Sequence, residues 1–170
     1  MIKLRKFQKN DDTALAANAN SPAIAAYMRT VFPSPYLLSD ARWWVAEGHQ
    51  LNGSVNLVID LNGECIGNIG FNLINNRNHK TVELGYWLGE AHWGKGFISE
   101  AIAVFTDLIF LEHDVKEIIA SVASPNVASM KVLEKCGYKC GKINENSVEV
   151  RAGVFDEHVF VKRSSNKKKT

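Results

Sequence analysis

A pair of glycines between a strand-like run and a helix-like run is the feature that most limits how this chain folds and what it binds. The segment His92-Trp93-Gly94-Lys95-Gly96-Phe97 follows the run 81–88 and precedes a run with helical apolar spacing. Glycine lets the backbone approach a ligand closely, where a side chain would block it. The first turn of a helix presents unpaired N–H groups and the positive end of its dipole. The sequence therefore predicts a site for a phosphate or pyrophosphate at residues 92–97.

Two other kinds of glycine loop fit this segment less well. A Walker loop needs a serine or threonine hydroxyl for magnesium directly after Gly-Lys, but here Gly96 follows Lys95. A dinucleotide-binding loop needs a third glycine where this chain has Ser99. It also needs an acidic residue at the end of the next strand to bind the ribose, whereas Glu117 stands at the start of that strand. A backbone cradle for phosphate therefore remains the favoured interpretation.

Apolar periodicity predicts a mixed α/β domain. Strands are expected at 2–5, 55–59, 65–74, 81–88, 118–122, 138–143 and 157–161, and residues 144–156 are expected to be turn and irregular strand. Helices are expected at 12–18, within 21–50 with a break at Pro33 and Pro35, at 98–110, and from a Ser124 cap to Gly137. The strands 81–88 and 118–122, joined by one helix, predict a right-handed parallel crossover. We therefore expect a mostly antiparallel sheet with one central parallel pair and helices on both faces.

Composition bounds the class of protein. At 170 residues and 46% hydrophobic, the chain suits one domain, expected at 1–163, followed by a basic tail, 164–170, expected to be disordered. A net charge of +2 gives no support for nucleic-acid binding, and no apolar run reaches the roughly 18 residues of a membrane span. The cysteines and histidines lack metal-ligand spacing, so no metal site is expected. Because no signal-peptide pattern is present, we expect a cytoplasmic protein, either a monomer or a homodimer.

Four segments, in this order along the chain, resemble the GNAT superfamily of N-acetyltransferases. They are Phe32-Pro-Ser-Pro-Tyr36 with Asp40-Ala41 and Trp44, then Glu83-Leu-Gly-Tyr-Trp-Leu88, then Trp93-Gly-Lys-Gly-Phe-Ile-Ser-Glu-Ala101, and last Asn126-Val-Ala-Ser-Met-Lys-Val-Leu-Glu-Lys-Cys-Gly-Tyr138. The branch that they resemble most acetylates the N-termini of ribosomal proteins (RimJ/RimL-like). In the glycine loop, Gly94 and Gly96 occupy the family's two small positions, while Ala91 replaces its leading Gln or Arg.

The resemblance implies acetyl-CoA as the co-substrate and no metal. In this family the parallel strands splay apart and the pantetheine arm lies between them, and Gly85 stands where a bulge would start that splay. The residues expected to bind the co-substrate are Tyr86, Trp87, Leu88, His92, Trp93, Gly94, Lys95, Gly96, Phe97 and Asn126. For His92, a solvent-facing loop position is the alternative. For Asn126, the alternative is an ordinary polar residue in the first turn of a helix.

Acetyl transfer requires a neutral amine, although α-amines have a pKa near ~8 and lysine-type amines near ~10.4. Glu83 is the candidate general base. It shares a strand face with Gly85 and Trp87, and a carboxylate within an otherwise apolar strand is unfavourable to bury without a function. The alternative is a structural charge paired with Lys80 or Arg77.

The leaving sulfur needs a hydrogen-bond donor or an acid, and by resemblance Ser129 is the candidate. An ordinary first-turn serine is the alternative. Cys136 abuts the expected helix end without a neighbouring histidine, so packing is favoured over an acyl-cysteine mechanism. We therefore expect direct attack of the amine in a ternary complex.

The aromatic residues Tyr36 and Trp44 are expected to bind the acceptor, and packing of a helical lid is the alternative. The acceptor is a primary amine, on either a small molecule or a peptide N-terminus. A non-catalytic module that senses acyl-CoA is the second class of function considered. The presence of both Glu83 and Ser129 favours the enzyme.

Overall fold

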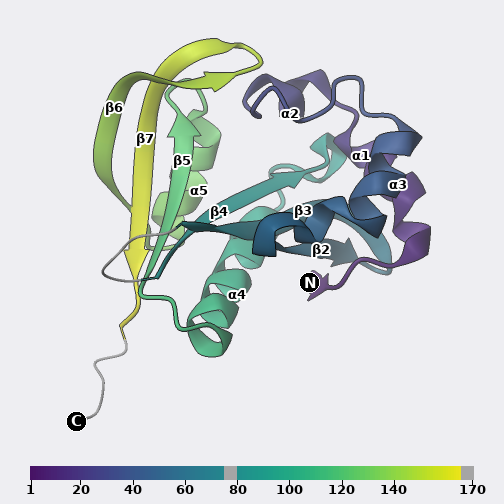
Figure 1. Cartoon of the computed structure of the whole chain (residues 1–170), viewed down its shortest axis with the longest axis horizontal. Coiled ribbons are helices and arrows are strands. Elements are labelled where there is room, and N and C mark those ends of the chain that lie inside the picture. The colour runs from purple at the N-terminus through teal and green to yellow at the C-terminus, as the bar shows by residue number, and fades with distance from the viewer. Residues whose placement is uncertain (75–79, 166–170) are drawn as a thin grey trace.

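The computed structural model describes residues 1–74 and 80–165 (Figure 1). Within these residues, seven strands form one sheet in the order β1-β2-β3-β4-β5-β7-β6. The strands are β1 (Lys3–Arg5), β2 (Val55–Leu61), β3 (Glu64–Ile74), β4 (Thr81–Leu88), β5 (Glu117–Ala123), β6 (Lys139–Val150) and β7 (Gly153–Arg163). The helices are η1 (Lys9–Asp11), α1 (Asp12–Ala19), α2 (Pro22–Ala26), α3 (Leu38–Ala46), η2 (Gly48–Gly53), η3 (Glu90–His92), α4 (Phe97–Glu112) and α5 (Val127–Lys135). Most of the expected tail, 164–170, lies outside the described residues.

The β4-α4-β5 unit is the parallel crossover that the sequence predicts. In the described chain, β4 and β5 pair from Thr81 opposite Glu117 to Glu83 opposite Ile119, and no further. Beyond that point β4 continues beside β3, and β5 continues beside β7. The two strands therefore splay apart within the sheet, and Figure 1 shows β5 rising steeply while β4 runs to the right.

The bulge expected at Gly85 does not start this splay. In the described β3–β4 ladder, Gly85 lies opposite Gly70 in an unbroken register that runs from Thr81 to Leu88. The prediction of a bulge was therefore wrong. Each strand instead keeps its antiparallel partner on the outer side, and the twist of those pairings carries β4 and β5 apart.

Helices cover both faces of the sheet, as predicted. The α4/α5 face buries Val82, Leu84, Leu88, Ala101, Ile102, Phe105, Ile109 and Leu133. The α1/α3 face buries Leu15, Ala19, Ala41, Val58, Cys65 and Trp87. Because side chains alternate along a strand, Glu83 shares the α1/α3 face with Trp87, whereas Tyr86 lies on the α4/α5 face.

Two predictions for the C-terminal third are corrected. Helix α5 begins at Val127, and Asn126 caps it by accepting the Ser129 N–H at 3.3 Å, so the expected Ser124 cap was wrong. Asparagine caps helices as well as serine does, so the sequence alone did not separate the two positions. The expected irregular segment 144–156 is mostly strand, because β6 and β7 extend to a turn at residues 151–152.

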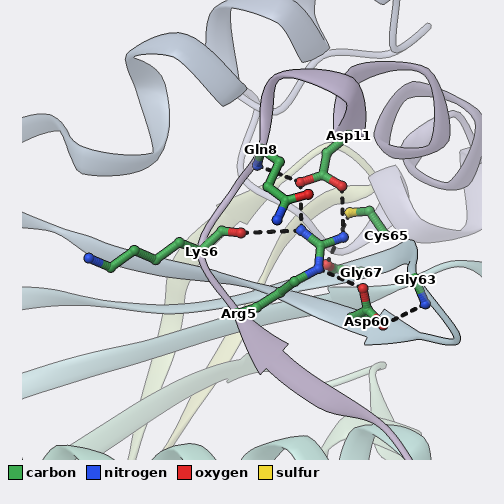
Figure 2. Close-up of polar contacts among 8 residues, drawn as sticks. All are labelled: Arg5, Lys6, Gln8, Asp11, Asp60, Gly63, Cys65 and Gly67. Atoms are coloured by element: carbon green, nitrogen blue, oxygen red, sulfur yellow. Dashed lines mark hydrogen bonds and ion pairs between the residues drawn. The ribbon is translucent and has the colours of Figure 1, made fainter.

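Arg5 ties β1 to the first helical turn and to the β2–β3 hairpin (Figure 2). Its Nη1 and Nη2 atoms each donate to a carboxylate oxygen of Asp11 at 2.8 Å, and its Nε donates to Asp60 at 2.6 Å. Asp11 and Asp60 are only 4% and 5% exposed. One guanidinium therefore compensates two buried carboxylates.

We expect Arg5→Ala to lower the free energy of unfolding by about 3 kcal/mol, because it leaves buried charge uncompensated. Burial opposes ionisation of Asp60, but hydrogen bonds from Arg5 and the Gly63 N–H lower the pKa of Asp60 overall. This stabilisation is complete above the pKa of an unfolded aspartate, about 3.9, and is lost as the pH falls through the lower folded value. Denaturant unfolding of both proteins at neutral and acidic pH measures the difference. Equal stability at neutral pH would contradict the compensation.

Candidate active site

The glycine loop joins β4 to α4 with both glycines in the left-handed region, at φ 72° for Gly94 and 81° for Gly96. Trp93 Nε1 fastens the loop by donating to the Leu88 carbonyl at 2.7 Å. Gly96 is the N-cap of α4, and its carbonyl accepts the first helical hydrogen bond, from the Glu100 N–H at 3.1 Å. The N–H groups of residues 97–99 precede that bond and point out of the helix end.

The space in front of the loop is open. A Cβ built on Gly94 or on Gly96 meets no atom of the described chain within 4 Å. The 16-residue helix α4 places the positive end of its dipole here. Lys95, whose Nζ donates to the Ala91 carbonyl at 3.0 Å, adds a full positive charge. The arrangement suits a phosphate or pyrophosphate.

His92 is the loop residue with a buried polar atom in need of a partner. Its ring lies 6.5 Å from the Phe97 ring, and its Nδ1 is buried without a hydrogen-bond partner among the described residues. A buried polar atom is unfavourable unless a ligand or water satisfies it. The solvent-facing alternative is therefore disfavoured, and a ligand contact through His92 stays a prediction.

A hydrogen bond between Tyr86 and Ser129 connects the two sides of the splay. The Tyr86 hydroxyl lies 2.6 Å from Ser129 Oγ, which brings β4 against the first turn of α5. Burial raises the pKa of Tyr86 to about 12, with the Ser129 hydrogen bond opposing the shift. The phenol is therefore protonated at neutral pH and can donate to Ser129. The Asn126 cap fixes the backbone of the same serine, so Asn126 positions Ser129 whatever else it contacts.

Glu83 stands at the head of the splay on the opposite, α1/α3 face. Its side chain is 25% exposed, and its Oε1 accepts a hydrogen bond from Arg29 Nη2 at 3.3 Å. The sequence indicated Lys80 or Arg77 as the structural partner, but Arg77 lies outside the described residues and the contact is with Arg29. Gly85 is the next residue on this face of β4. A Cβ built on Gly85 would meet no atom of the described chain within 4 Å. Glu83 therefore borders free space.

The tip of the β6–β7 hairpin is bonded to the segment that carries Arg29. The Arg151 N–H donates to the Met28 carbonyl at 3.1 Å, and the Ala152 N–H donates to the Ala26 carbonyl at 2.9 Å. Arg151 Nη2 adds a bond to the Phe32 carbonyl at 2.6 Å. In Figure 1 this tip accordingly lies beside α2, above the splay. The C-terminal hairpin and the N-terminal helices together enclose the Glu83 side.

The aromatic residues expected near the acceptor are placed differently from one another. Tyr36 is 7% exposed and packs 5.3 Å from the Phe32 ring, which in turn lies 6.2 Å from Trp87. Tyr36 and Trp87 therefore belong to the α1/α3 core. For Tyr36 this agrees with the packing alternative, and a contact between Trp87 and the co-substrate stays a prediction. Trp44 is half-buried and donates from Nε1 to Asn68 at 3.2 Å, and it lines a cavity of about 450 Å³.

Sequence reasoning missed three contacts of the site. Arg29 is an isolated arginine in an irregular segment, Arg151 lies in a turn, and the Tyr86–Ser129 bond joins residues 43 positions apart. None of these has a periodic or motif signal.

In the described residues, no group of three or more His, Cys, Asp or Glu side chains is placed to hold a metal ion. The described helices include none that is long and apolar enough to cross a membrane.

Comparison with known proteins gives consistent matches. A family model described as an acetyltransferase (GNAT) domain matches residues 2–139. The uncharacterized N-acetyltransferase p20 of Bacillus licheniformis is 29% identical over 165 residues, which cover 94% of this chain and 90% of p20. The ribosomal-protein-serine acetyltransferase of Escherichia coli (strain K12) is 32% identical over 90 residues, or 53% of this chain and 50% of that protein. RimJ of Mycobacterium smegmatis, solved with CoA-disulfide, shares the fold at a TM-score of 0.87 and 18% identity, over 99% of this chain and 85% of that chain.

Proposed function

This chain belongs to the acetyltransferase (GNAT) family, and we propose that it transfers an acetyl group from acetyl-CoA to the N-terminal amine of a peptide or protein. The observation that carries the proposal is the splay of β4 and β5 directly after Glu83. It opens a gap in the sheet with the glycine loop at one end, Glu83 on one face and Ser129 on the other. Donor and acceptor can therefore meet through the sheet from opposite sides.

The loop and the freed strand edge fit the co-substrate. Acetyl-CoA supplies an activated thioester when it is bound. The N–H groups of residues 97–99 and the open faces of Gly94 and Gly96 suit its pyrophosphate. His92 Nδ1, which has no partner in the described part of the chain, offers a further contact. Beyond Glu83, the edge of β4 that faces β5 has no strand partner among the described residues, and its free backbone groups suit the amides of the pantetheine arm.

We assign the proton transfers to Glu83, Ser129 and Tyr86. Glu83 removes a proton from the incoming ammonium, and the neutral nitrogen then forms the new bond to the thioester carbonyl carbon. When the carbon–sulfur bond breaks, the nitrogen loses its second proton to water and becomes the amide. The departing sulfur lies toward α5, where Ser129 Oγ donates a proton to it, and water restores the proton of the serine–tyrosine pair. The Tyr86 hydroxyl, 2.6 Å from Ser129 Oγ, can return a proton to the serine. Base and acid thus act from opposite faces of β4.

The enclosure of the Glu83 side supports a chain end as the acceptor. The hydrogen bonds from Arg151 and Ala152 to the segment 26–32 hold the hairpin tip over this side. An extended chain terminus can therefore reach Glu83 more easily than an amine in the middle of a folded surface. The similarity to a ribosomal-protein-serine acetyltransferase points the same way. A small-molecule amine is the other acceptor compatible with the enclosure.

An acetyl-CoA turnover assay with short peptides and small amines tests the proposed function. Release of free CoA thiol measures the rate, and mass spectrometry of the acceptor locates the acetyl group. We expect peptides with a free α-amine to be acetylated and the same peptides blocked at that amine to be inert. Binding of acetyl-CoA without turnover on any acceptor would favour the non-catalytic sensor instead.

Tyr86 and Ser129 should act as one unit. We expect Ser129→Ala to lower kcat by roughly 10²-fold and Tyr86→Phe by roughly tenfold, at the lower end of general acid catalysis. If the phenol acts through the serine, the double variant should be no slower than Ser129→Ala alone. Tyr138→Phe is the matched control, because it removes a buried hydroxyl bonded to Thr106 at 2.7 Å and should alter stability only. Additive losses in the double variant would argue against the relay.

A further inference from the structure

A cavity between η2 and the ends of β2 and β3 lies apart from the glycine loop, on the β3 side of Glu83. We propose that it binds the first side chain of the acceptor and selects a neutral hydrogen-bonding group, such as a carboxamide. The inference rests on the proposed function, because it places the acceptor amine at Glu83. The cavity has a volume of about 450 Å³ and is walled by Trp44 on the α1/α3 face of the sheet. That volume lies within the usual range of small-ligand sites, roughly 300–1,000 Å³.

Strand register places this cavity next to Glu83. Asn72 on β3 lines the cavity and lies directly opposite Glu83 on β4. Opposed residues in an antiparallel ladder point to the same face, with Cβ atoms roughly 4.5–5.5 Å apart. The first substituent of an amine held at Glu83 therefore passes over Asn72 into the cavity.

The lining offers hydrogen bonds and apolar walls without charge. Its side chains are those of Trp44, Leu51, Asn52, Ser54, Asn56, Asn72 and Leu73, with Gly48 completing it. Asn52 and Asn72 are exposed, and within the described chain neither side-chain amide makes a hydrogen bond. Each free amide offers both a donor and an acceptor, which a carboxamide or hydroxyl complements. A charged group entering the cavity would find no counter-charge among these lining side chains.

A closed ring of hydrogen bonds fixes the back wall. Trp44 Nε1 donates to Asn68 at 3.2 Å, Asn68 Nδ2 donates to Asn56 Oδ1 at 3.0 Å, and Asn56 Nδ2 donates to the His49 carbonyl at 2.7 Å. His49 Nδ1 closes the ring by donating to the Trp44 carbonyl at 2.9 Å. A Cβ at Gly70 would collide with the Asn56 side chain, so glycine is required beneath it. Because each of these polar groups is satisfied, the wall is rigid before a ligand arrives.

The test compares three amidated tetrapeptides that differ only in the first residue, which is glutamine, lysine or glycine. Calorimetry with the CoA-loaded protein gives Kd, and thiol release with acetyl-CoA gives kcat/KM. We expect wild-type protein to prefer the glutamine peptide over the lysine peptide by at least about tenfold, the size of one satisfied hydrogen bond. The glycine peptide, which has no side chain, reports on the amine site alone.

Two variants separate recognition from folding. Asn72→Ala should raise the Kd of the glutamine peptide about tenfold and leave the Kd of the glycine peptide unchanged. Asn52→Asp keeps the shape, and aspartate tolerates the φ of 55° at this position as asparagine does. The added charge should shift the preference toward the lysine peptide by at least about tenfold. Asn10→Ala, an exposed amide on η1, is the control.

The outcomes distinguish this proposal from the proposed function. Selective binding without turnover would support the cavity and overturn the acetyl transfer. Acetylation of all three peptides with equal kcat/KM would support the transfer and overturn the cavity. If Asn72→Ala raises the Kd of the glycine peptide as much as that of the glutamine peptide, the proposed role of the cavity is also overturned. The Asn72 amide would then contact the amine and not the first side chain.

Discussion

Replacing Gly96 with valine is expected to abolish binding of coenzyme A while the protein stays folded. The Cβ of valine would project into the open space in front of the loop, where no atom of the described chain lies within 4 Å. In the proposed function, that space is where the pyrophosphate of coenzyme A approaches the N–H groups of residues 97–99. We expect Kd to rise by at least about 10²-fold, because several charge-assisted hydrogen bonds are lost together. Calorimetric titration with coenzyme A measures the effect.

The control for this variant is Gly63→Val. Gly63 has φ 90° in the β2–β3 turn, and a Cβ there also meets nothing within 4 Å in the described chain. Both substitutions therefore force a β-branched residue into the left-handed region, at a similar cost of about 1–3 kcal/mol. We expect Gly63→Val to lower Tm and to keep the affinity for coenzyme A. The loss of affinity in Gly96→Val would then be due to the changed glycine loop and not to lower stability. Tight binding by folded Gly96→Val protein would refute the phosphate cradle.

The parts of the fold that follow from local chemistry were predictable from the sequence. The Asn62-Gly63 turn, the two-residue alternation along β4 and the helical spacing of α4 each depend on neighbouring residues. Together they predict the crossover and place Glu83 and Tyr86 on opposite faces of one strand. The glycine loop was predictable for the same reason, because a strand, two glycines and a helix follow each other directly.

The remainder of the site depends on contacts between distant parts of the chain. Arg29 reaches Glu83 across 54 positions, and Arg151 reaches Phe32 across 119. Neither contact leaves a pattern in the local sequence, because any irregular segment can carry an arginine. The bulge expected at Gly85 failed similarly: glycine allows a bulge, but the outer partners β3 and β7 decide where the strands separate. Trp44 was predicted from its chemistry and its contact with the acceptor stays a prediction, whereas its cavity required the register of β2 and β3.

The contact between Arg29 and Glu83 bears on how Glu83 works. The Arg29 side chain is 65% exposed, so this pair is well solvated and weak. An incoming ammonium can therefore replace the guanidinium at little cost. In the proposed mechanism, Arg29 therefore gives way to the incoming amine and does not block Glu83.

Glu83→Gln is expected to lower kcat at neutral pH by roughly 10²–10⁴-fold, the usual size of general base catalysis. Glutamine keeps the shape and a hydrogen-bond acceptor for Arg29, but it cannot take a proton. Because an α-amine has a pKa near ~8, the acceptor becomes neutral without help as the pH rises above that value. The deficit of the variant should therefore shrink between neutral and alkaline pH.

The matched control is Glu117→Gln on β5. Glu117 also pairs with an exposed arginine, Arg163, at 3.0 Å, and its side chain is 17% exposed. It lies opposite Thr81 in the parallel pair, at the closed end of the splay. Losing this charge should change stability slightly and leave kcat unaltered at every pH. If Glu83→Gln instead shows a deficit that is constant with pH, or matches Glu117→Gln, then Glu83 orients the site without acting as the base, and the amine must lose its proton to solvent.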